Sequence, residues 1–540
     1  MDDFSFLPRK DILDLLDKRV RDFKDGYRQN IALLGDGLIG KTTLLKQFLD
    51  RFQDDKIISV YVDIAPFEFA LFVKRFINSL LYHFLKNQQL ISSREEFQLL
   101  LKMAKERLPQ TGCLLEQIAL RCDREKPETI FKELFTALDV FAQETQKQCV
   151  IIFDEFHHLK KIGAKNICQE LGKRIMYQKN TLFIFSSSSC HEAKEILVND
   201  LSLLFGNFET IELQAFSAAT SLLLIQQVLA DIFVPKEYTD FLIHFTGGHP
   251  FYLHIICQEL HKLCQMGQKE FCDKKILIHA LENLLFQEWG TLNMKFSAQL
   301  AQISSERHRH DFWCCLDAIA LGKNRIKDLT PFLKKTQKEL SIKLNRLAEA
   351  GLVTKNGSFY SCNDRVMSFW LKFVHYEKFS ALSPDYREQS GHFRHRIQTE
   401  IEDFILHSKT NIAERMLELF NQFEGDDIHV DRKRFRLAPY RDLKLLTFDN
   451  TNLKIGLWGK THDSFLLAAI KEDGIHEHDV NEFIQLAKKF KHKTIDKIII
   501  GLGDIERNAR LLAKDSHITT WDTRNVNVLL DLFGKPRIVK

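Results

Sequence analysis

Residues 30–49 read "NIALLGDGLIGKTTLLKQFL", and this stretch decides the class of fold. The apolar run at residues 31–34 is typical of a buried strand, and residues 41–52 are typical of the helix that follows it. The turn between them combines glycines with a lysine and a hydroxyl side chain. So much backbone freedom directly before a helix indicates a loop that closes around a ligand.

Residues 35–42, "GDGLIGKT", match the phosphate-loop pattern G-x-x-x-x-G-K-[ST]. The glycines let backbone N–H groups converge on an anion, and the helix N-terminus adds partial positive charge. We expect Lys41 to reach the β- and γ-phosphates of ATP and Thr42 to ligate Mg²⁺. The alternative is an ordinary glycine-rich turn between a strand and a helix. The predicted nucleotide-binding loop comprises Gly35, Asp36, Gly37, Leu38, Ile39, Gly40, Lys41, Thr42 and Thr43.

A phosphate loop predicts a second site, where an apolar strand ends in acid, and "CVIIFDEFHHL" at residues 149–159 supplies it. We expect Asp154 to hold the Mg²⁺ shell and Glu155 to polarise the attacking water. Without the loop, such an acidic pair is more often a solvated turn. The adjacent His157 and His158 are interpreted as the start of a helix, because successive residues rarely converge on one metal ion.

A strand that ends in four serines follows at "TLFIFSSSSCHE", residues 181–192. A polar side chain at this position can sense the γ-phosphate, and Ser187 and Ser188 are the candidates. The predicted catalytic set is therefore Lys41, Glu155 and Ser188. The alternative is that a serine-rich strand end is simply a turn.

Strands predicted at residues 31–34, 57–63, 149–153, 181–186 and 209–213 alternate with helices. This alternation favours an α/β fold, a parallel sheet covered on both faces, over residues 1–214. Loop signals fall near residues 88–89 and 109–112. Residues 215–300 are expected to form a helical lid, interrupted at Gly247-Gly248-His249-Pro250.

The next segment, residues 301–382, has the winged-helix pattern. Helices are predicted at 311–321, 325–333 and 336–350, followed by a hairpin that turns at Asn356-Gly357. Its third helix and hairpin carry a basic edge suited to DNA phosphates, formed by Lys334, Lys335, Lys338, Lys343, Arg346 and Lys355. The alternative is a solvated face on a domain that relays the nucleotide state. Polar residues 383–398 are predicted to be a linker, followed by an amphipathic helix at 400–420.

About the first 380 residues resemble P-loop ATPases that link the origin-recognition branch of the AAA+ class to the STAND ATPases, a group common in archaea and some bacteria. The resemblance rests on "FLPRKDILDLL", "GDGLIGKTTLL", "IIFDEFHHL", "FIFSSSS", "LFGNFETIELQAFS", "FTGGHPFYL" and "FYSCNDRVMSFWLKFV". It implies that Arg9 lies near the base of the bound nucleotide and that His249 and Pro250, with Gly248, lie over the nucleotide. It also implies that the serine-bearing strand lies between the loop strand and the acidic strand. Asn207 stands where the family often has an arginine that serves a neighbouring subunit, which argues against that route of activation.

Residues 399–540 resemble a restriction-endonuclease-like domain. Its metal site needs an acid on one strand and acid-x-lysine on the next. In "FLLAAIKED", Lys471 fits the lysine, but Ala469 occupies the acid position. In "RDLKLLTFD", taken as the preceding strand, the acid position falls near Lys444, with Asp442 displaced and Glu402 as one other remnant. We therefore expect a non-catalytic domain.

Composition limits the functional classes. The 540 residues are 45% hydrophobic and 27% charged, as in soluble globular proteins, with no bilayer-length apolar run and no secretory signal. Eleven cysteines without a Cys-x-x-Cys pair favour free thiols and a cytoplasmic location. The net charge of +4 means that any nucleic-acid contact must come from a local patch.

The leading hypothesis is an ATP-binding and ATP-hydrolysing molecular switch. The alternatives are an ATP-dependent DNA-processing nuclease and a nucleotide-binding scaffold with little hydrolysis. The expected partners are ATP with Mg²⁺, DNA through the winged helix and a protein through the C-terminal domain, with no membrane.

Overall fold

The computed structural model describes residues 7, 9–52, 54–64, 68–91, 93, 95–162, 166–201, 208–303, 309–380, 385–430, 433–449, 451–462, 464–490 and 495–540. The chain divides after Ala215 into two compact units, residues 1–215 and 216–540, and each is described by itself. Asn207, the position of the expected arginine, lies outside the described residues.

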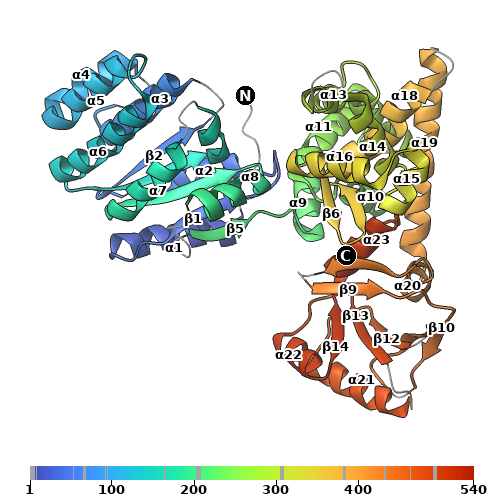
Figure 1. The fold of residues 1–540 in the computed structure, drawn as a ribbon. Coiled ribbons are helices and arrows are strands. Elements are labelled where there is room, and N and C mark those ends of the chain that lie inside the picture. Colours follow the sequence, from blue (N-terminus) through green and yellow to red (C-terminus); the bar gives the residue numbers. More distant parts are fainter. Residues whose placement is uncertain are drawn as a thin grey trace. The chain divides into compact units, whose positions relative to one another are not determined.

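The first unit is built on a five-stranded parallel sheet in the order β2-β3-β4-β1-β5 (Figure 1). Its strands are β1 (Asn30–Leu34), β2 (Ile57–Asp63), β3 (Gln148–Asp154), β4 (Thr181–Ser187) and β5 (Phe208–Glu212). The serine-bearing strand β4 lies between the loop strand β1 and the acidic strand β3, which confirms that expectation. Because all five strands are parallel, their carboxyl ends share one edge.

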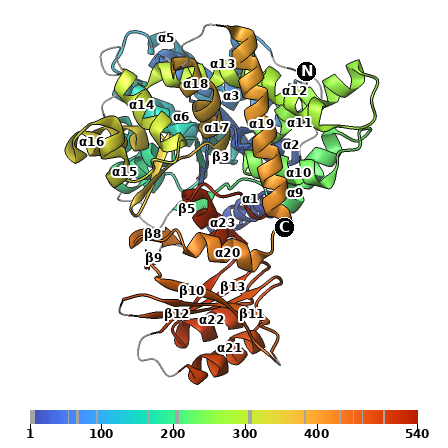
Figure 2. The same cartoon turned by 90° about the vertical axis from the view of Figure 1, so that its right-hand side faces the viewer.

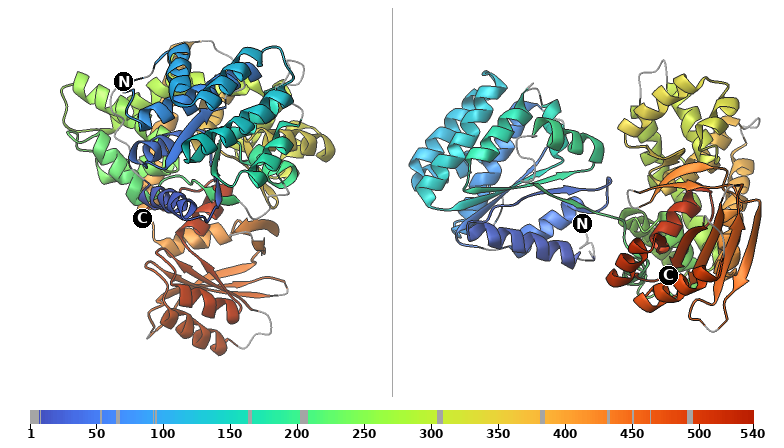
Figure 3. Two further views of the ribbon diagram at one scale, coloured as in Figure 1. Left: turned by 90° about the vertical axis from the view of Figure 1, so that its left-hand side faces the viewer. Right: turned by 60° about the horizontal axis from the view of Figure 1, so that its bottom comes forward.

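Helices cover both faces of this sheet (Figures 1 and 3). Alternate strand residues point to opposite faces: Ile152 and Ile184 pack with α1 and α2, whereas Phe153 and Phe185 pack with α3, α6 and α7. The predicted α/β fold is thereby confirmed. The helical elements are α1 (Lys10–Lys24), α2 (Lys41–Arg51), α3 (Phe69–Asn87), α4 (Phe97–Arg107), α5 (Pro109–Arg121), α6 (Pro127–Thr145), η1 (Phe156–Lys161), α7 (Ile167–Tyr177), α8 (Cys190–Glu195) and η2 (Ile196–Asp200).

The loop predicted at residues 109–112 is wrong, because α5 begins at Pro109 directly after α4. Proline is favoured in the first turn of a helix, where its missing N–H is no loss. Gly112 allows the two helices to pack closely, since a Cβ there would lie 2.9 Å from the Cα of Lys105. Sequence signals of a loop here reflect a tight helix junction.

The second unit begins with helices that surround the Gly-Gly-His-Pro break. Gly248 adopts φ +77°, and a Cβ there would lie 2.3 Å from the carbonyl oxygen of Phe216, so only glycine fits. The helices are α9 (Ala218–Val228), α10 (Lys236–Thr246), α11 (Pro250–Met266), α12 (Lys274–Leu285) and α13 (Thr291–Gln302).

Three helices and a hairpin follow, as predicted. They are α14 (Arg309–Ala320), α15 (Ile326–Leu333), α16 (Gln337–Glu349), β6 (Val353–Asn356) and β7 (Phe359–Cys362). Asn356 pairs with Phe359, so the turn residues are Gly357 and Ser358, one position later than predicted. An isolated antiparallel bridge joins Arg325 to Phe359 of this hairpin. The segment ends in α17 (Arg365–Trp370), η4 (Leu371–His375) and α18 (Tyr376–Ser380).

The predicted linker at 383–398 is wrong for residues 386–398, which belong to helix α19 (Tyr386–Lys409). Apolar residues at helical spacing, Phe393, Ile397, Ile401 and Phe404, are buried along one side of this otherwise polar helix. The helix predicted at 400–420 is in fact two, because α19 ends at Lys409 and α20 (Ile412–Phe420) begins after a cap by Asn411.

The C-terminal part contains a five-stranded sheet in the order β10-β11-β12-β13-β14 and a separate hairpin, β8–β9 (Figure 2). The strand before β12 is β11, which the sequence interpretation missed, so Lys444 on β10 is not beside β12. The elements are β8 (Asp426–Val430), β9 (Lys433–Leu437), β10 (Asp442–Thr447), β11 (Ile455–Lys460), β12 (Phe465–Lys471), α21 (Glu477–Lys489), β13 (Ile495–Gly501), α22 (Arg507–Asp515), β14 (Ile518–Trp521) and α23 (Thr523–Leu532). Among the described residues, no helix has the length and apolar character needed to cross a bilayer.

Two glycine substitutions test the corrected helices. Gly112→Ala forces a Cβ against the backbone of α4 and should destabilise the first unit by about 1–3 kcal/mol. Gly391→Ala in α19 meets no atom within 4 Å and should be neutral or stabilising by up to about 1 kcal/mol. Calorimetry of both variants checks this, and a Gly391→Ala protein that melts earlier than wild type would contradict the helix.

Candidate functional site

The phosphate-loop residues connect β1 to α2 at the carboxyl edge of the first unit's sheet. Gly40 has φ +99°, a conformation that favours glycine, and it lets α2 begin immediately at Lys41. Asp36, Gly37 and Leu38 are exposed at the rim, and a Cβ at Gly37 would meet open space. The loop therefore presents backbone to solvent in front of a helix N-terminus, the arrangement that binds anions.

Lys41 is buried, although its head group is an ammonium. Its Nζ donates to the carbonyl oxygens of Gly35 and Asp36, each at 2.9 Å. Burial lowers its pKa, and the charges of Glu155 and Asp154 oppose this shift. The carboxylates at the strand ends thus help to keep a buried cation charged beside the loop.

Asp154, the last residue of β3, accepts hydrogen bonds from hydroxyl groups on three other elements. Its Oδ2 accepts hydrogen bonds from Thr42 Oγ1 at 2.6 Å and Tyr61 Oη at 2.7 Å, and its Oδ1 accepts one from Ser186 Oγ. Only 1% of Asp154 is exposed. A buried carboxylate needs such partners, and here they fix its orientation toward the first turn of α2.

Glu155 follows directly, with the left-handed backbone angle φ +54°. Its Oε2 accepts hydrogen bonds from the backbone N–H and the hydroxyl of Ser188, at 2.8 and 2.7 Å. Non-glycine residues in this conformation are strained, and such strain clusters at functional sites. Ser188 therefore contacts Glu155, and the sequence-predicted catalytic residues Lys41, Glu155 and Ser188 share one edge of the sheet.

Ser187 has a different role. Its hydroxyl lies 2.8 Å from Nδ1 of His157, in the buried layer beneath the edge. His157 and His158 begin the short helix η1, as predicted from their position. Burial, and then the charge of His158, lower the pKa of His157 to about 4, so this imidazole is neutral.

Arg9 contacts the backbone of the phosphate loop. Its guanidinium donates to the carbonyl oxygens of Gln214, at 2.7 Å, and Ile39, at 3.3 Å. His249 and Pro250 belong to the second unit, where His249 occupies the position before α11 without a side-chain capping hydrogen bond and Pro250 is the first residue of the helix. Contact of these three residues with a nucleotide stays a prediction.

Sequence reasoning missed Tyr61 and Ser186. Both lie near the carboxyl ends of the strands that flank β3, where parallel strands bring their last residues together. The strand order would have pointed to them, because polar residues ending β2 and β4 must neighbour Asp154. Asp63 also ends β2 beside Asp154, and burial together with the charge of Asp154 raises its pKa.

The donor set fits Mg²⁺ with a triphosphate. The hydroxyl of Thr42 and the carboxylate of Asp154 are adjacent oxygen ligands of the kind this ion prefers. No cluster of three or more His, Cys, Asp or Glu suited to a metal occurs among the described residues, so phosphate oxygens and water would have to complete the shell.

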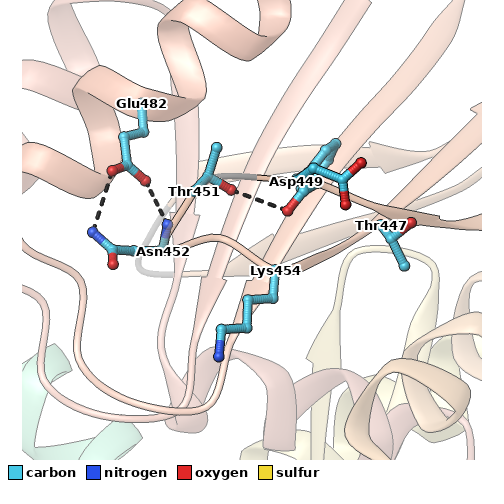
Figure 4. A pocket seen from close by; sticks show the side chains of 7 residues that line it. Thr447, Asp449, Thr451, Asn452, Lys454 and Glu482 are labelled. Carbon is cyan, nitrogen blue, oxygen red and sulfur yellow. Dashed lines mark hydrogen bonds between the residues drawn. The ribbon is translucent and has the colours of Figure 1, made fainter.

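A pocket of about 570 Å³ lies elsewhere, at the turn between β10 and β11 (Figure 4). It is lined by six polar residues and Phe448, and Glu482 accepts hydrogen bonds from the backbone N–H and the side-chain amide of Asn452, at 2.9 and 3.2 Å. Figure 4 shows Asp449 and Lys454 apart from this pair. The hydrogen bonds of Glu482 serve to hold the turn.

A match to a known sequence family agrees with an ATPase core. Residues 21–256 match the sequence family described as an ATPase domain predominantly from Archaea. A Walker-type ATPase of Pyrococcus abyssi is 17% identical with TM-score 0.47, covering 68% of this chain and 96% of its own. The ORC2 protein of Aeropyrum pernix, in ADPNP–ADP complexes, is 12% identical with TM-score 0.44, covering 70% and 98%. The ORC1 protein of the same organism, in complex with DNA, is 11% identical with TM-score 0.36, covering 68% and 92%. No curated protein matches the chain.

The buried His157 predicts a pH dependence. Its pKa is about 4 in the folded chain and about 6.5 when unfolded, so only the unfolded chain takes up a proton between these values. The contribution of neutral His157 to stability is complete above pH 6.5 and falls as the pH drops toward 4.

Thermal unfolding from pH 7.5 to 4 measures this effect. The difference in unfolding temperature between wild type and His157→Gln should become smaller as the pH falls. The exposed control His191→Gln should unfold at the wild-type temperature at each pH. A constant difference between wild type and His157→Gln would show that this imidazole titrates normally.

Proposed function

We propose that the first unit binds and hydrolyses ATP with Mg²⁺ and that the second unit responds to the nucleotide state, as in a molecular switch of the AAA+/STAND type. The observation that carries the proposal is the convergence of Thr42, Asp154 and Glu155 at the N-terminus of α2. The match of residues 21–256 to an ATPase family supports it independently.

The loop and Lys41 would bind the phosphates of ATP. The ammonium of Lys41 now donates to two loop carbonyls. Phosphate oxygens carry full negative charge and form stronger hydrogen bonds with an ammonium than neutral carbonyls do. Lys41 and the N–H groups of residues 35–43 would therefore hold the β- and γ-phosphates of ATP.

Thr42 and Asp154 would hold Mg²⁺, which supplies charge stabilisation for the transferring phosphoryl group when it is bound. Tyr61 and Ser186 keep the Asp154 carboxylate in place through their hydroxyl groups. Burial, and then the charge of Asp154, raise the pKa of Tyr61, so its hydroxyl remains a donor throughout the ordinary pH range.

Glu155 would act as the general base on the attacking water. Ser188 binds one carboxylate oxygen, Oε2, through two hydrogen bonds, which restricts the direction of the carboxyl group. Ser188 therefore serves the reaction by positioning Glu155, and its hydroxyl lies at the edge where a γ-phosphate would be sensed. Geometry of this kind supports base catalysis because the base is held before the substrate arrives.

The response of the second unit would pass through the residues around the Gly-Gly-His-Pro break. Tyr252 on α11 donates to Asp364, which caps α17, and Lys295 on α13 donates to the Tyr252 hydroxyl at 2.8 Å. A displacement of α11 would therefore move or break the contact with Asp364 at the start of α17, near the end of the winged-helix segment.

A second path starts from α10, which ends at the same break. Arg365 on α17 donates to the backbone oxygen of His244 at 3.1 Å and pairs with Asp531 on α23. Arg537 also binds Asp531, at 2.6 Å, and its backbone N–H donates to Nδ1 of His244 at 3.1 Å. Burial raises the pKa of Asp531, but the charges of Arg365 and Arg537 outweigh it and hold that pKa below its ordinary value. This network ties the lid to the C-terminal domain.

We propose that the C-terminal, endonuclease-like domain is not catalytic. Ala469 pairs across the strands with Gly456, so neither position contributes a carboxylate. Lys471 binds the fully buried Asp479 at 2.7 Å, and Asp479 caps α21 together with His476. Lys471 thus stabilises a helix start, which disfavours the nuclease alternative.

The remaining proposals concern partners and location. The C-terminal domain is proposed as a protein-binding module, and DNA is considered in the next subsection. All eleven cysteines are free, which supports a cytoplasmic, reducing location.

Glu155→Gln tests the proposed reaction. The amide keeps the shape and can still contact Ser188, but it cannot accept a proton, so ATP turnover should fall on the order of a hundredfold or more. Binding of ATP with Mg²⁺, measured by titration calorimetry, should remain. Glu195→Gln removes the same charge from an exposed site in the same unit and should hydrolyse ATP at the wild-type rate. Wild-type turnover in Glu155→Gln would exclude this residue as the base.

A further inference from the structure

The hairpin β8–β9 has one apolar face and one positively charged face. On β9, Phe435 and Leu437 pack into the C-terminal core, together with Ile428 and Val430 of β8. The alternate residues Arg434 and Arg436 point away from this core and are exposed, and Lys433 is exposed at the start of the strand. The core therefore anchors the hairpin and leaves its cations in solvent.

One acid offsets this charge only in part. Asp427 of β8 pairs with Arg434 at 2.7 Å, in a pair whose arginine side chain is 70% exposed. Arg436 faces the same Asp427 across the strands. By the same alternation, Lys433 lies on the side of Phe435, at the exposed end of the hairpin. Within the part of the chain that the structure describes, neither Lys433 nor Arg436 forms an ion pair, so the outward face with Arg434 and Arg436 keeps a net positive charge and Lys433 adds a cation at its edge.

The position of the hairpin is fixed by the neighbouring hairpin β6–β7 (Figures 1 and 2). The backbone N–H of Ser358 donates to the carbonyl oxygen of Asp427 at 2.8 Å, and the Asp427 N–H donates back to the Ser358 hydroxyl at 3.1 Å. The side-chain amide of Asn356 exchanges two hydrogen bonds with the backbone of His429, at 2.6 and 3.1 Å. A surface held in place in this way loses little conformational entropy when it binds a partner.

Helix α16, whose basic edge the sequence suggested as a DNA contact, is less suited. Lys335 and Lys343 both pair with Asp311, at 3.0 and 2.7 Å, and Lys343 is only 16% exposed. The exposed Lys338 and Arg346 share their helix with two exposed acids, Glu339 and Glu349. The charge on this helix is mixed, whereas the charge on β9 is of one sign.

We propose that the β8–β9 hairpin is a contact surface for duplex DNA, with Lys433, Arg434 and Arg436 on the phosphate backbone. A two-stranded ribbon fits the major groove of B-DNA, and residues i and i+2 of a strand are about 7 Å apart, so neighbouring cations can reach separate phosphates. This surface lies outside the nucleotide site and goes beyond the proposed ATPase function.

The chemistry of the face favours duplex DNA over other polyanions. Its apolar residues point into the core, so it offers no side chains for insertion into a lipid bilayer. The outward positions of β8 and β9 carry no Phe, Tyr or Trp ring for stacking on unpaired bases, and the imidazole of His429, opposite Arg434, is the one ring among their described residues. The remaining interaction is between cations and phosphates. Duplex DNA presents one phosphate charge about every 1.7 Å along its axis, and its major groove admits a two-stranded ribbon, whereas the major groove of duplex RNA is deep and narrow.

The test uses the full chain without nucleotide and a labelled mixed-sequence duplex, followed by fluorescence anisotropy over a salt series. A triple variant, Lys433→Gln with Arg434→Gln and Arg436→Gln, should bind at least roughly tenfold more weakly at low salt. Its log-log salt slope should be shallower by up to about 2.7, at about 0.9 for each lost phosphate contact. The double variant Arg434→Lys with Arg436→Lys keeps the charge and should keep most of the slope.

The matched control neutralises three cations near or on α16, as Lys334→Gln with Lys338→Gln and Arg346→Gln, and it should retain the wild-type slope. Loss of binding in this control, with wild-type binding in the β9 variant, would overturn the proposal. It would equally be overturned if wild type bound no duplex at low salt, or preferred single strands or anionic vesicles. Thermal unfolding of the β9 variant at the wild-type temperature, measured by calorimetry, confirms that the second unit is folded.

Discussion

The burial of the Asp154 carboxylate is the constraint on which the first unit depends. A carboxylate that is 1% exposed must be surrounded by donors, and here they come from the loop helix and from the strands on either side of β3. One side chain thereby brings β2, β3, β4 and α2 into register at a common edge. Lys41 and Glu155 acquire their positions relative to this fixed point, and a metal between Thr42 and Asp154 would use the same hydrogen-bonded frame.

In the second unit, a network of ion pairs connects elements that are far apart in the sequence. Asp531, whose side chain is 23% exposed, stands between two arginines, one on α17 and one in the C-terminal tail, and both arginines also contact His244. Moving either arginine away would leave the partly buried carboxylate of Asp531 with one cationic partner in place of two. These contacts therefore oppose separation of α10 and α17 from the C-terminal part. The hairpin contact between β6–β7 and β8–β9 strengthens the same connection.

Strands and the phosphate loop could be predicted because their signals are local. The run at residues 31–34 is buried throughout, and Gly40 and Lys41 stand where a helix begins after a left-handed residue. Contacts across the sheet could not be predicted in the same way. Tyr61 and Ser186 look like ordinary strand residues until the strand order places them beside Asp154.

Segments with mixed signals account for the errors. Residues 386–398 are polar and contain a glycine, yet four apolar residues at helical spacing were enough to fold α19 onto the second unit. In the sequence Pro109 predicts a loop, but proline is favourable at the first position of a helix, where the structure places it. The short strand β11 contains two glycines and was missed, and as a result Lys444 was aligned with the wrong neighbour.

The central claim is that Asp154 is the protein's anchor for Mg²⁺, and titration calorimetry with ATP in Mg²⁺ or in EDTA tests it most directly. Wild type should bind ATP at least roughly tenfold more tightly with Mg²⁺, a difference of about 1.4 kcal/mol or more. Asp154→Asn should lose this gain while binding metal-free ATP as wild type does, and Asp50→Asn, an exposed control on α2, should keep it. An undiminished Mg²⁺ effect in Asp154→Asn would contradict the account.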